Sequence, residues 1–402
     1  MPEPSRKLVP LEGLRGIAAT VVVIYHLVLG FTASGVGLVP HGHGVFDPLA
    51  QFGLGLLNGG AAVAVFFVLS GFILSLPFAR DRRVSRVLVA LLKRWPRLAG
   101  LTVITCLVAY GLILWSGHDY KHAADITGAG WMGSHGNSPI AHRNLTWLTA
   151  IHEGLIAVFT QGEVRFDSPL WTMRIELFCS LGIFLAAPVL FALRSWPLRL
   201  ALIAVAVLAA GTTFPQTHFS DFLAGAVLAM LYAEGRLPQI PGKIALPLGI
   251  LALYLFSFTY EQTLLIHAPL KAIMPPGDSA HFVWDAGAML SIVLLLGNPS
   301  LHRLFSGGWA AWLGLVSFPV YLLHTPMMMS VGAHSLVAAA DVLGVRGSEL
   351  LAAVVTLILT LACAVPLARI DQLWLALLGR ITRPLLKQPG ALSPAGPSTS
   401  TK

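Results

Sequence analysis

Residues 8–30 read LVPLEGLRGIAATVVVIYHLVLG, an apolar stretch interrupted by only a few polar positions, among them Glu12, Arg15 and His26. A helix needs about 20 predominantly apolar residues to cross a bilayer, and this stretch is long enough. Its internal charges and its length argue against a cleavable signal peptide. The beginning of the chain therefore predicts a transmembrane helix, so the bilayer decides the fold.

Nine further apolar runs follow this first one. The hydrophobic fraction of the chain is 56%, its charged fraction is 11% and its mean hydropathy is +0.76, whereas soluble domains carry about 25% charged residues. The sequence predicts an all-α, polytopic integral membrane protein with about ten transmembrane helices. The nine further runs are residues 55–78, 98–117, 168–193, 196–213, 217–234, 243–262, 282–298, 309–331 and 349–369.

The distribution of lysine and arginine predicts the orientation. Most of the 26 basic residues fall in cytoplasmic segments if the N-terminus is cytoplasmic, as the positive-inside rule requires. We expect a membrane domain over residues 8–385, with both termini in the cytoplasm. Residues 386–402, rich in Pro, Ser, Gly and Thr, are expected to form a short disordered cytoplasmic tail. The formal charge of +8 is explained by topology and does not predict a nucleic-acid partner.

Neither metal binding nor redox chemistry is predicted. Cys106, Cys179 and Cys363 each lie inside an apolar run and are interpreted as packing residues. His118 and His122 have the spacing of a helical metal pair, but the sequence indicates no third ligand. We interpret them as part of a polar outer loop and expect no bound metal or cofactor.

Ionisable residues inside apolar runs are functional candidates, because a charge in the bilayer is costly unless it is paired or faces a polar cavity. Arg15 and His26 are eleven residues apart, about three helical turns, and so share one face about 16 Å apart. That face suits a site reached through the membrane. The alternative is that Arg15 pairs with Glu12 at i, i+3 and that His26 makes only a packing contact.

Other apolar runs carry further polar residues at the level expected for the outer half of the bilayer. Arg174 and Glu176 are two residues apart and cannot share a helix face, so each needs a partner on another helix, in a site or in a structural ion-pair network. Ser70, in FFVLSGF, could serve a site or simply allow two helices to approach closely. The remaining candidates are Trp171, Asp221 with His218, Tyr321 and His324.

Six motifs occur in one order along the chain: LEGLRGIAATVVVIYH at 11–26, FFVLSGF at 66–72, RWPR at 94–97, PLWTMRIEL at 169–177, HFSDFLAGAVLA at 218–229 and SFPVYLLHTP at 317–326. Together they resemble the membrane acyltransferase type 3 family of bacterial O-acyltransferases. Many members of that family have two adjacent acidic residues in the fourth motif. Here Leu177 follows Glu176, and Arg174 replaces a small polar residue. The soluble outer domain that some members carry is not indicated.

The resemblance implies transfer of an acyl group, most readily acetyl, from cytoplasmic acyl-CoA to a hydroxyl of a carbohydrate or glycolipid, such as exopolysaccharide or O-antigen, in a bacterial inner membrane. A small molecule such as an antibiotic is an alternative acceptor. The catalytic candidates are His26 as base, Arg15 and Glu176. The expected substrate-binding residues are Arg94, Arg97, Ser70, Trp171, Arg174, Tyr321, His324 and Asp221, the first two for CoA phosphates.

Three alternatives stay open at this point. The acyl group could pass through a transient acyl-histidine before it reaches the acceptor. The protein could instead be a transporter or flippase, because charged residues inside spans also line substrate pathways. It could also be a non-enzymatic membrane partner in polysaccharide export.

Overall fold

The computed structural model describes residues 8–32, 56–80, 84–117, 119–136, 145–193, 195–213, 218–258, 265–273 and 280–386. This part of the chain is helical and contains no β-strand, which confirms the all-α prediction. The helices are α1 (Val9–Phe31), α3 (Gly59–Arg80), α4 (Val84–Ser116), α5 (Asp119–Thr127), α6 (Gly130–Gly136), α7 (Trp147–His152), η3 (Glu153–Ala157), α8 (Val158–Thr160), η4 (Ser168–Leu170), α9 (Trp171–Ala192), α10 (Trp196–Thr213), α11 (Phe219–Ala233), α12 (Gly242–Phe256), η5 (Leu265–His267), α13 (Ala268–Ile273), α14 (Ala280–Gly297), α15 (Pro299–Leu304), α16 (Gly308–Met327), η6 (Met328–Gly332), α17 (Ala333–Thr382) and η7 (Arg383–Leu386).

Several helices are long and apolar enough to cross a membrane, so the chain is a multi-pass membrane protein. Within the described residues there are six such segments and four shorter apolar helices. Each of the ten predicted runs overlaps a helix of the described residues, although the exact number of spans stays a prediction. The six segments are Val9–Phe31, Gly59–Arg80, Ser85–Ser116, Ser168–Ala192, Ala280–Gly297 and Gly308–Leu385; the shorter four are Trp147–Thr160, Trp196–Ala206, Phe219–Ala233 and Gly242–Phe256.

The third helix begins earlier than the sequence predicted. α4 starts at Val84 rather than at residue 98 and runs for 33 residues, about 50 Å. Its basic first half was expected to be a cytoplasmic connection. Arg, Lys and Leu are good helix formers, so the helix continues where the apolar run stops. Residues 387–402, which hold almost all of the predicted tail, lie outside the described residues.

Small residues bring the helices that carry the site into close contact. α1 packs along α16, and α3 packs along α11. A Cβ atom at Gly16 would lie 2.5 Å from Cβ of Leu313, and one at Gly71 would lie 2.0 Å from the carbonyl oxygen of Phe222. Small residues at such crossings allow the backbones to approach, which is how helices associate within a bilayer.

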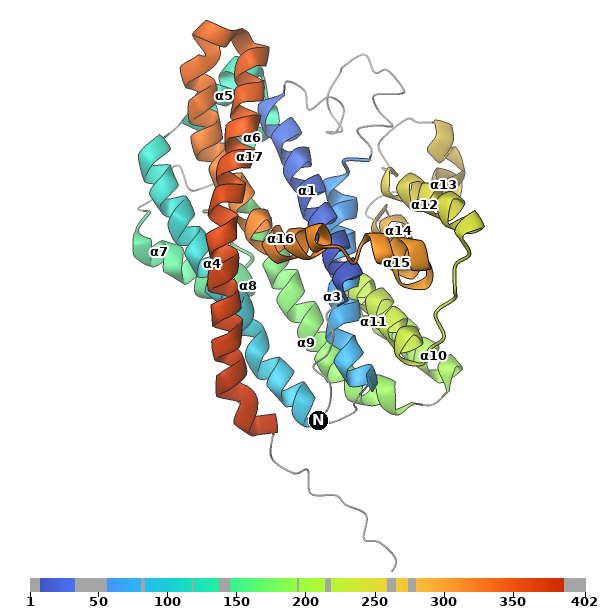
Figure 1. Ribbon diagram of the computed structural model, residues 1–402. Helices are drawn as coiled ribbons and strands as arrows, with labels where there is room; N and C mark the ends of the chain where they lie inside the picture. The colour runs from blue at the N-terminus through green and yellow to red at the C-terminus, as the bar shows by residue number, and fades with distance from the viewer. Residues whose placement is uncertain are drawn as a thin grey trace, which may run out of the picture.

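The last helix, α17, consists of a short part before Gly344 and a long part after it. α17 contains a non-helical residue, Gly344, with a φ of 67°, a conformation that glycine adopts without steric cost. The chain therefore turns at Gly344, and the part that follows runs the full height of the molecule (Figure 1). α16 and the first part of α17 are joined by the π-helix η6, which follows Pro326.

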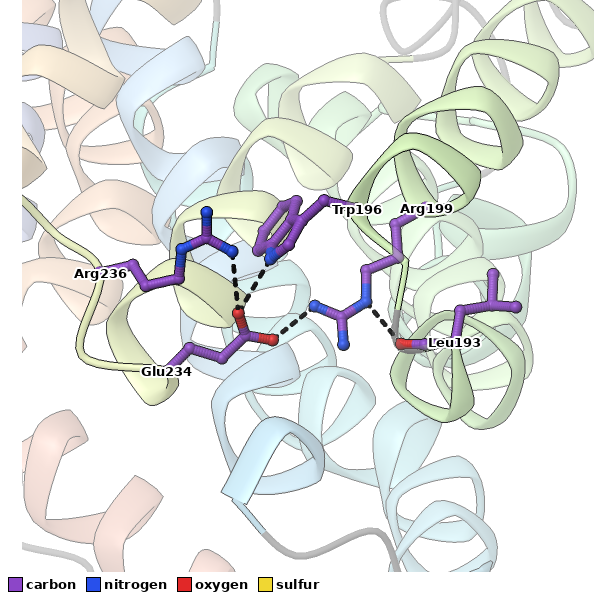
Figure 2. A network of polar contacts seen from close by, with 5 residues as sticks. All are labelled: Leu193, Trp196, Arg199, Glu234 and Arg236. Carbon is purple, nitrogen blue, oxygen red and sulfur yellow. Dashed lines mark hydrogen bonds and ion pairs between the residues drawn. The ribbon is translucent and has the colours of Figure 1, made fainter.

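A polar clamp joins the start of α10 to the end of α11 (Figure 2). Glu234 accepts hydrogen bonds from Nη1 of Arg199 at 2.5 Å and from Nε1 of Trp196 at 2.9 Å. Its other basic neighbour is Arg236, at 3.6 Å. Both guanidinium groups also lie about 5 Å from the Trp196 ring centroid, within the range of cation–π attraction. The clamp holds the α9–α10 connection against α11.

Candidate active site

Two histidines from distant parts of the chain meet between α1 and α16. Nδ1 of His26 lies 2.8 Å from Nε2 of His324, and the two rings are stacked with centroids 5.0 Å apart. The packing of α1 along α16 brings them together, since the sequence separates them by 298 positions. His324 is only 1% exposed. The structure thus joins two residues that the sequence had put forward separately.

The hydrogen bonds define which nitrogen of each ring carries a proton. Nδ1 of His324 lies 2.7 Å from the backbone oxygen of Tyr321, and a carbonyl only accepts, so this nitrogen must donate. A buried imidazole is most stable when neutral, because a charge would lose its solvation. Nε2 of His324 therefore accepts from Nδ1–H of His26 at 2.8 Å, and the Thr325 hydroxyl makes a second, longer contact with it at 3.2 Å. The lone pair of His26 then lies on its Nε2, which is the arrangement of an oriented general base.

Aromatic side chains hold this pair in place. The indole of Trp131, from α6, stacks on His26 at 5.3 Å between centroids. Tyr321 lies 5.9 Å from the His324 ring and packs edge-on against Phe66 of α3. Its hydroxyl is within hydrogen-bond distance of Thr172, at 3.1 Å, and of the Pro169 carbonyl, at 3.2 Å. The start of α9 is thereby fixed beside the histidine pair.

A buried ion pair joins α4 to α9. Nη2 of Arg94 bonds to Oε1 of Glu176, and Nε of Arg94 donates to Oγ of Ser180 at 2.7 Å. Arg94 is 5% exposed. Glu176 and Ser180 are four residues apart and share one helix face, so one arginine engages both. The partner that the sequence predicted for Glu176 on another helix is therefore Arg94.

Two further arginines lie near this ion pair. Arg15 forms the i, i+3 ion pair with Glu12 at 2.7 Å that the sequence offered as the alternative. Arg97, one turn after Arg94 on α4, has an exposed side chain and is electrostatically coupled to Arg94 and Arg15. Arg15, Arg94 and Arg97 are therefore within electrostatic range of one another, with Glu176 and Asp371 as acidic neighbours of Arg97. Such a cluster suits an anionic ligand.

The remaining candidates are more dispersed. Ser70 is half-buried on α3, one position before Gly71 at the close contact with α11. Arg174 is exposed and lies beside Gly162. Asp221 is fully buried and bonded to His218, whose ring lies 6.1 Å from that of Trp171.

Several residues of these clusters were not identified as candidates from the sequence. Trp131 was assigned to a polar outer loop, and Ser180 and Thr172 looked like ordinary residues of an apolar run. Asp285 could have been found, because it is a carboxylate inside the run 282–298. Within the described residues, no group of three His, Cys, Asp or Glu side chains is placed to hold a metal ion. His118 lies outside them.

An oriented imidazole pair and an arginine cluster within a bundle of apolar helices make a candidate membrane-embedded enzyme site. Residues 9–369 match the model of a family described as Acyltransferase domain. The chain belongs to this family and is an acyltransferase that does not transfer amino-acyl groups. It is 24% identical over 366 residues to the O-acetyltransferase PaAT-1 of Phomopsis amygdali, which covers 81% of this chain and 73% of that relative. No solved structure matches.

Proposed function

We propose that this chain is a membrane O-acyltransferase that moves an acyl group from cytoplasmic acyl-CoA to a hydroxyl of a carbohydrate or glycoconjugate in a bacterial inner membrane. The observation that carries the proposal is the series of two hydrogen bonds that links the Tyr321 carbonyl to His324 and His324 to His26. It fixes the tautomer of His26 as an orienting partner does in a nucleophile–base pair.

The chemical step follows from that tautomer. Nε2 of His26 takes the proton of the acceptor hydroxyl as its oxygen bonds to the thioester carbonyl carbon. The carbon–sulfur bond then breaks, and the proton passes from His26 to the sulfur of CoA. His324 acts as a positioning residue, because it holds the His26 ring and stabilises the imidazolium that forms transiently.

The donor site is proposed at the arginine cluster. Arg97, an exposed residue of α4, would bind the phosphates of CoA, for which its planar guanidinium is suited. Arg94 is already engaged by Glu176 and Ser180, so its part is to hold α4 against α9. Arg15, about 16 Å from His26 along α1 and ion-paired with Glu12, would add positive charge on the phosphate side of the donor.

The acceptor is supported less directly. The similarity to the O-acetyltransferase PaAT-1 supports transfer to oxygen, and the family resemblance of the sequence motifs supports a carbohydrate. Trp171 is 43% exposed and offers an aromatic face of the kind on which a sugar ring can stack. A small-molecule acceptor such as an antibiotic is the alternative, and the transfer assay described next distinguishes it from glycan and glycolipid by where the label appears.

The proposal is tested with radiolabelled acetyl-CoA and inside-out membrane vesicles that contain the wild-type chain or a variant at equal protein level. His26→Ala should reduce transfer of label into glycan or glycolipid by about 100-fold or more, the usual contribution of a general base. His324→Gln should retain more activity than His324→Ala, because the glutamine oxygen can accept the hydrogen bond from His26. His302→Ala, at an exposed histidine of α15, is the matched control and should be unchanged.

Two results would contradict the proposal. A wild-type chain that transfers label to no acceptor, also with other acyl-CoA donors, would favour the transporter or partner alternatives. Equal transfer by wild type and His26→Ala would leave the activity but remove His26 as the base.

A further inference from the structure

A second polar centre lies on the other face of α3 from the histidine pair. Phe66 of α3 packs against Tyr321, whereas the next residue, Phe67, packs against His218, 4.9 Å between centroids. The start of α9 shows the same division, because Trp171 lies beside His218 while Thr172 contacts Tyr321. Two pairs of adjacent residues therefore each contact both centres, which places the centres close together with α3 and the start of α9 between them.

The second centre is built on an oriented imidazole. Nδ1 of His218 lies 2.8 Å from Oδ2 of Asp221, and Oγ of Ser220 donates to Oδ1 of Asp221 at 3.1 Å. A carboxylate only accepts, so Nδ1 of His218 carries a proton, and in the neutral imidazole the lone pair is on Nε2. Asp221 lies in the first turn of α11, where the helix dipole favours a negative charge.

A second carboxyl group, that of Asp285, contacts the carboxyl group of Asp221. Asp285, on α14, is 5% exposed and hydrogen-bonds Asp221, which is fully buried. Two carboxyl groups in contact cannot both be ionised cheaply, so this pair shares a proton. Oδ1 of Asp285 has no hydrogen-bond partner among the described residues. Burying a polar group inside an apolar helix costs free energy of folding, so such a group is a candidate for a functional role.

The outer side of this centre is accessible. The side chain of His218 is 24% exposed, and the neighbouring Trp171 is 43% exposed. Trp171 begins α9, whereas Glu176 and Ser180 lie about one and a half and two and a half turns further along the same helix, where they bind Arg94. The proposed donor cluster and the His218 centre are thus separated along α9. An acceptor at His218 would approach from the end of α9 opposite the arginines.

We propose that His218 and Trp171 form the acceptor-binding subsite of the enzyme. The ring of a polyhydroxylated acceptor lies against the Trp171 indole, and one of its hydroxyls donates a hydrogen bond to Nε2 of His218. Asp221 and Asp285 act as positioning residues that hold the imidazole in this tautomer. The inference rests on the proposed function and assigns acceptor binding to this centre, while the chemistry remains at His26.

The test separates donor binding from acceptor binding in the full chain, purified into lipid nanodiscs. Radiolabelled acetyl-CoA is the donor, and the acceptor probes are methyl β-D-glucoside and the membrane-partitioning octyl β-D-glucoside. His218→Ala and Trp171→Ala should each raise the acceptor KM about tenfold, equivalent to 1.4 kcal/mol of binding. The KM for acetyl-CoA should stay within about twofold, which is under 0.5 kcal/mol. Trp171→Phe keeps an aromatic face and should fall between wild type and Trp171→Ala.

His334→Ala is the matched control, because His334 also pairs with an aspartate, Asp119, at 2.7 Å but lies in neither centre. An unchanged acceptor KM in His218→Ala and Trp171→Ala would overturn the inference and leave the proposed function standing. An equal rise of both KM values, or a fall in kcat alone, would also overturn it, because the role would then be structural. If wild type acylates neither glucoside, the proposed carbohydrate acceptor fails together with the inference. If His218→Ala does not fold, the same KM values are measured for His218→Gln and judged by the same outcomes.

Discussion

Arg94 and Arg97 lie one helical turn apart on α4, yet their surroundings differ completely. Arg94 is buried and bonded to Glu176 and Ser180, whereas Arg97 is exposed. Breaking a buried ion pair by removing one partner costs about 3–5 kcal/mol, because the other charge is left uncompensated. At the residue scale, Arg94 is therefore a structural requirement, and Arg97 can be tested for ligand binding.

Arg97→Ala should raise the KM for acetyl-CoA about tenfold, through loss of a charge-assisted contact with phosphate. The KM for acetyl-pantetheine, a donor without the CoA phosphates and nucleotide, should not change. Steady-state kinetics with both donors measure this. A parallel rise for the two donors would show that Arg97 does not bind the phosphates.

At the scale of elements, the contact between α3 and α11 depends on the absence of side chains. Gly71→Ala would place a Cβ atom 2.0 Å from the Phe222 carbonyl oxygen, so the helices would have to separate. We expect a loss of stability of about 1–3 kcal/mol, as for other overpacked sites. The midpoint of thermal unfolding in detergent measures it. Because α3 lies between the two polar centres, activity should fall as well.

Gly111→Ala is the control for this substitution. Gly111 lies within α4 and has nothing within 4 Å of its would-be Cβ. Alanine is favoured over glycine in a helix interior by about 1 kcal/mol, so this variant should be neutral or slightly more stable. Equal destabilisation by both substitutions would mean that the close crossing is not the cause.

The clamp around Glu234 predicts a dependence of stability on pH. Burial opposes the ionisation of Glu234, but the hydrogen bonds from Arg199 and Trp196 outweigh it and lower its pKa below the usual 4.5. A lowered folded-state pKa stabilises the protein above the unfolded-state value, and this contribution is lost as pH falls through the folded-state value.

Thermal unfolding should therefore show wild type losing more stability below about pH 4.5 than Glu234→Gln, in which this group no longer titrates. At pH 7 the variant should be the less stable of the two. Unfolding midpoints of both proteins between pH 7 and pH 3 give the comparison. Parallel curves with a constant offset would exclude the titration of Glu234 as the cause.

At the scale of the whole molecule, the two ends of the long helix after Gly344 can be used to measure the orientation of the chain in the membrane. Val342, just before the turn at Gly344, is 83% exposed, and Leu385 near the end of the described chain is 43% exposed. Residues 345–382 form a helix of about 57 Å, longer than the bilayer core of about 30 Å. The turn and the end of α17 therefore face opposite sides if the helix crosses.

In a variant without the three native cysteines, Val342→Cys should react with a membrane-impermeant maleimide in intact cells. Leu385→Cys should react only after the membrane is opened, because the basic residues predict a cytoplasmic end. The reverse pattern would invert the proposed orientation. Labelling of both from one side would show that this part of α17 does not cross.

The helical fold followed from composition and from the length of apolar runs, because a bilayer admits few backbone structures besides helices. His26, His324 and Glu176 could also be identified as candidates from the sequence, since polar groups inside apolar runs are rare. Arg94 became a candidate through the family resemblance of RWPR at 94–97. The limits of α4 could not, because a helix can continue into basic sequence where hydropathy no longer indicates it.

The sequence by itself determined the class of fold, the family and most of the polar candidates. Only the tertiary structure decided their partners: His324 for His26, Arg94 for Glu176, and Asp285 behind Asp221. The physical reason is that pairing across helices depends on how closely helices pack, on their rotation and on their relative height. These follow from contacts between residues far apart in the sequence, 82 positions for Arg94 and Glu176 and 298 for His26 and His324, which no local pattern records.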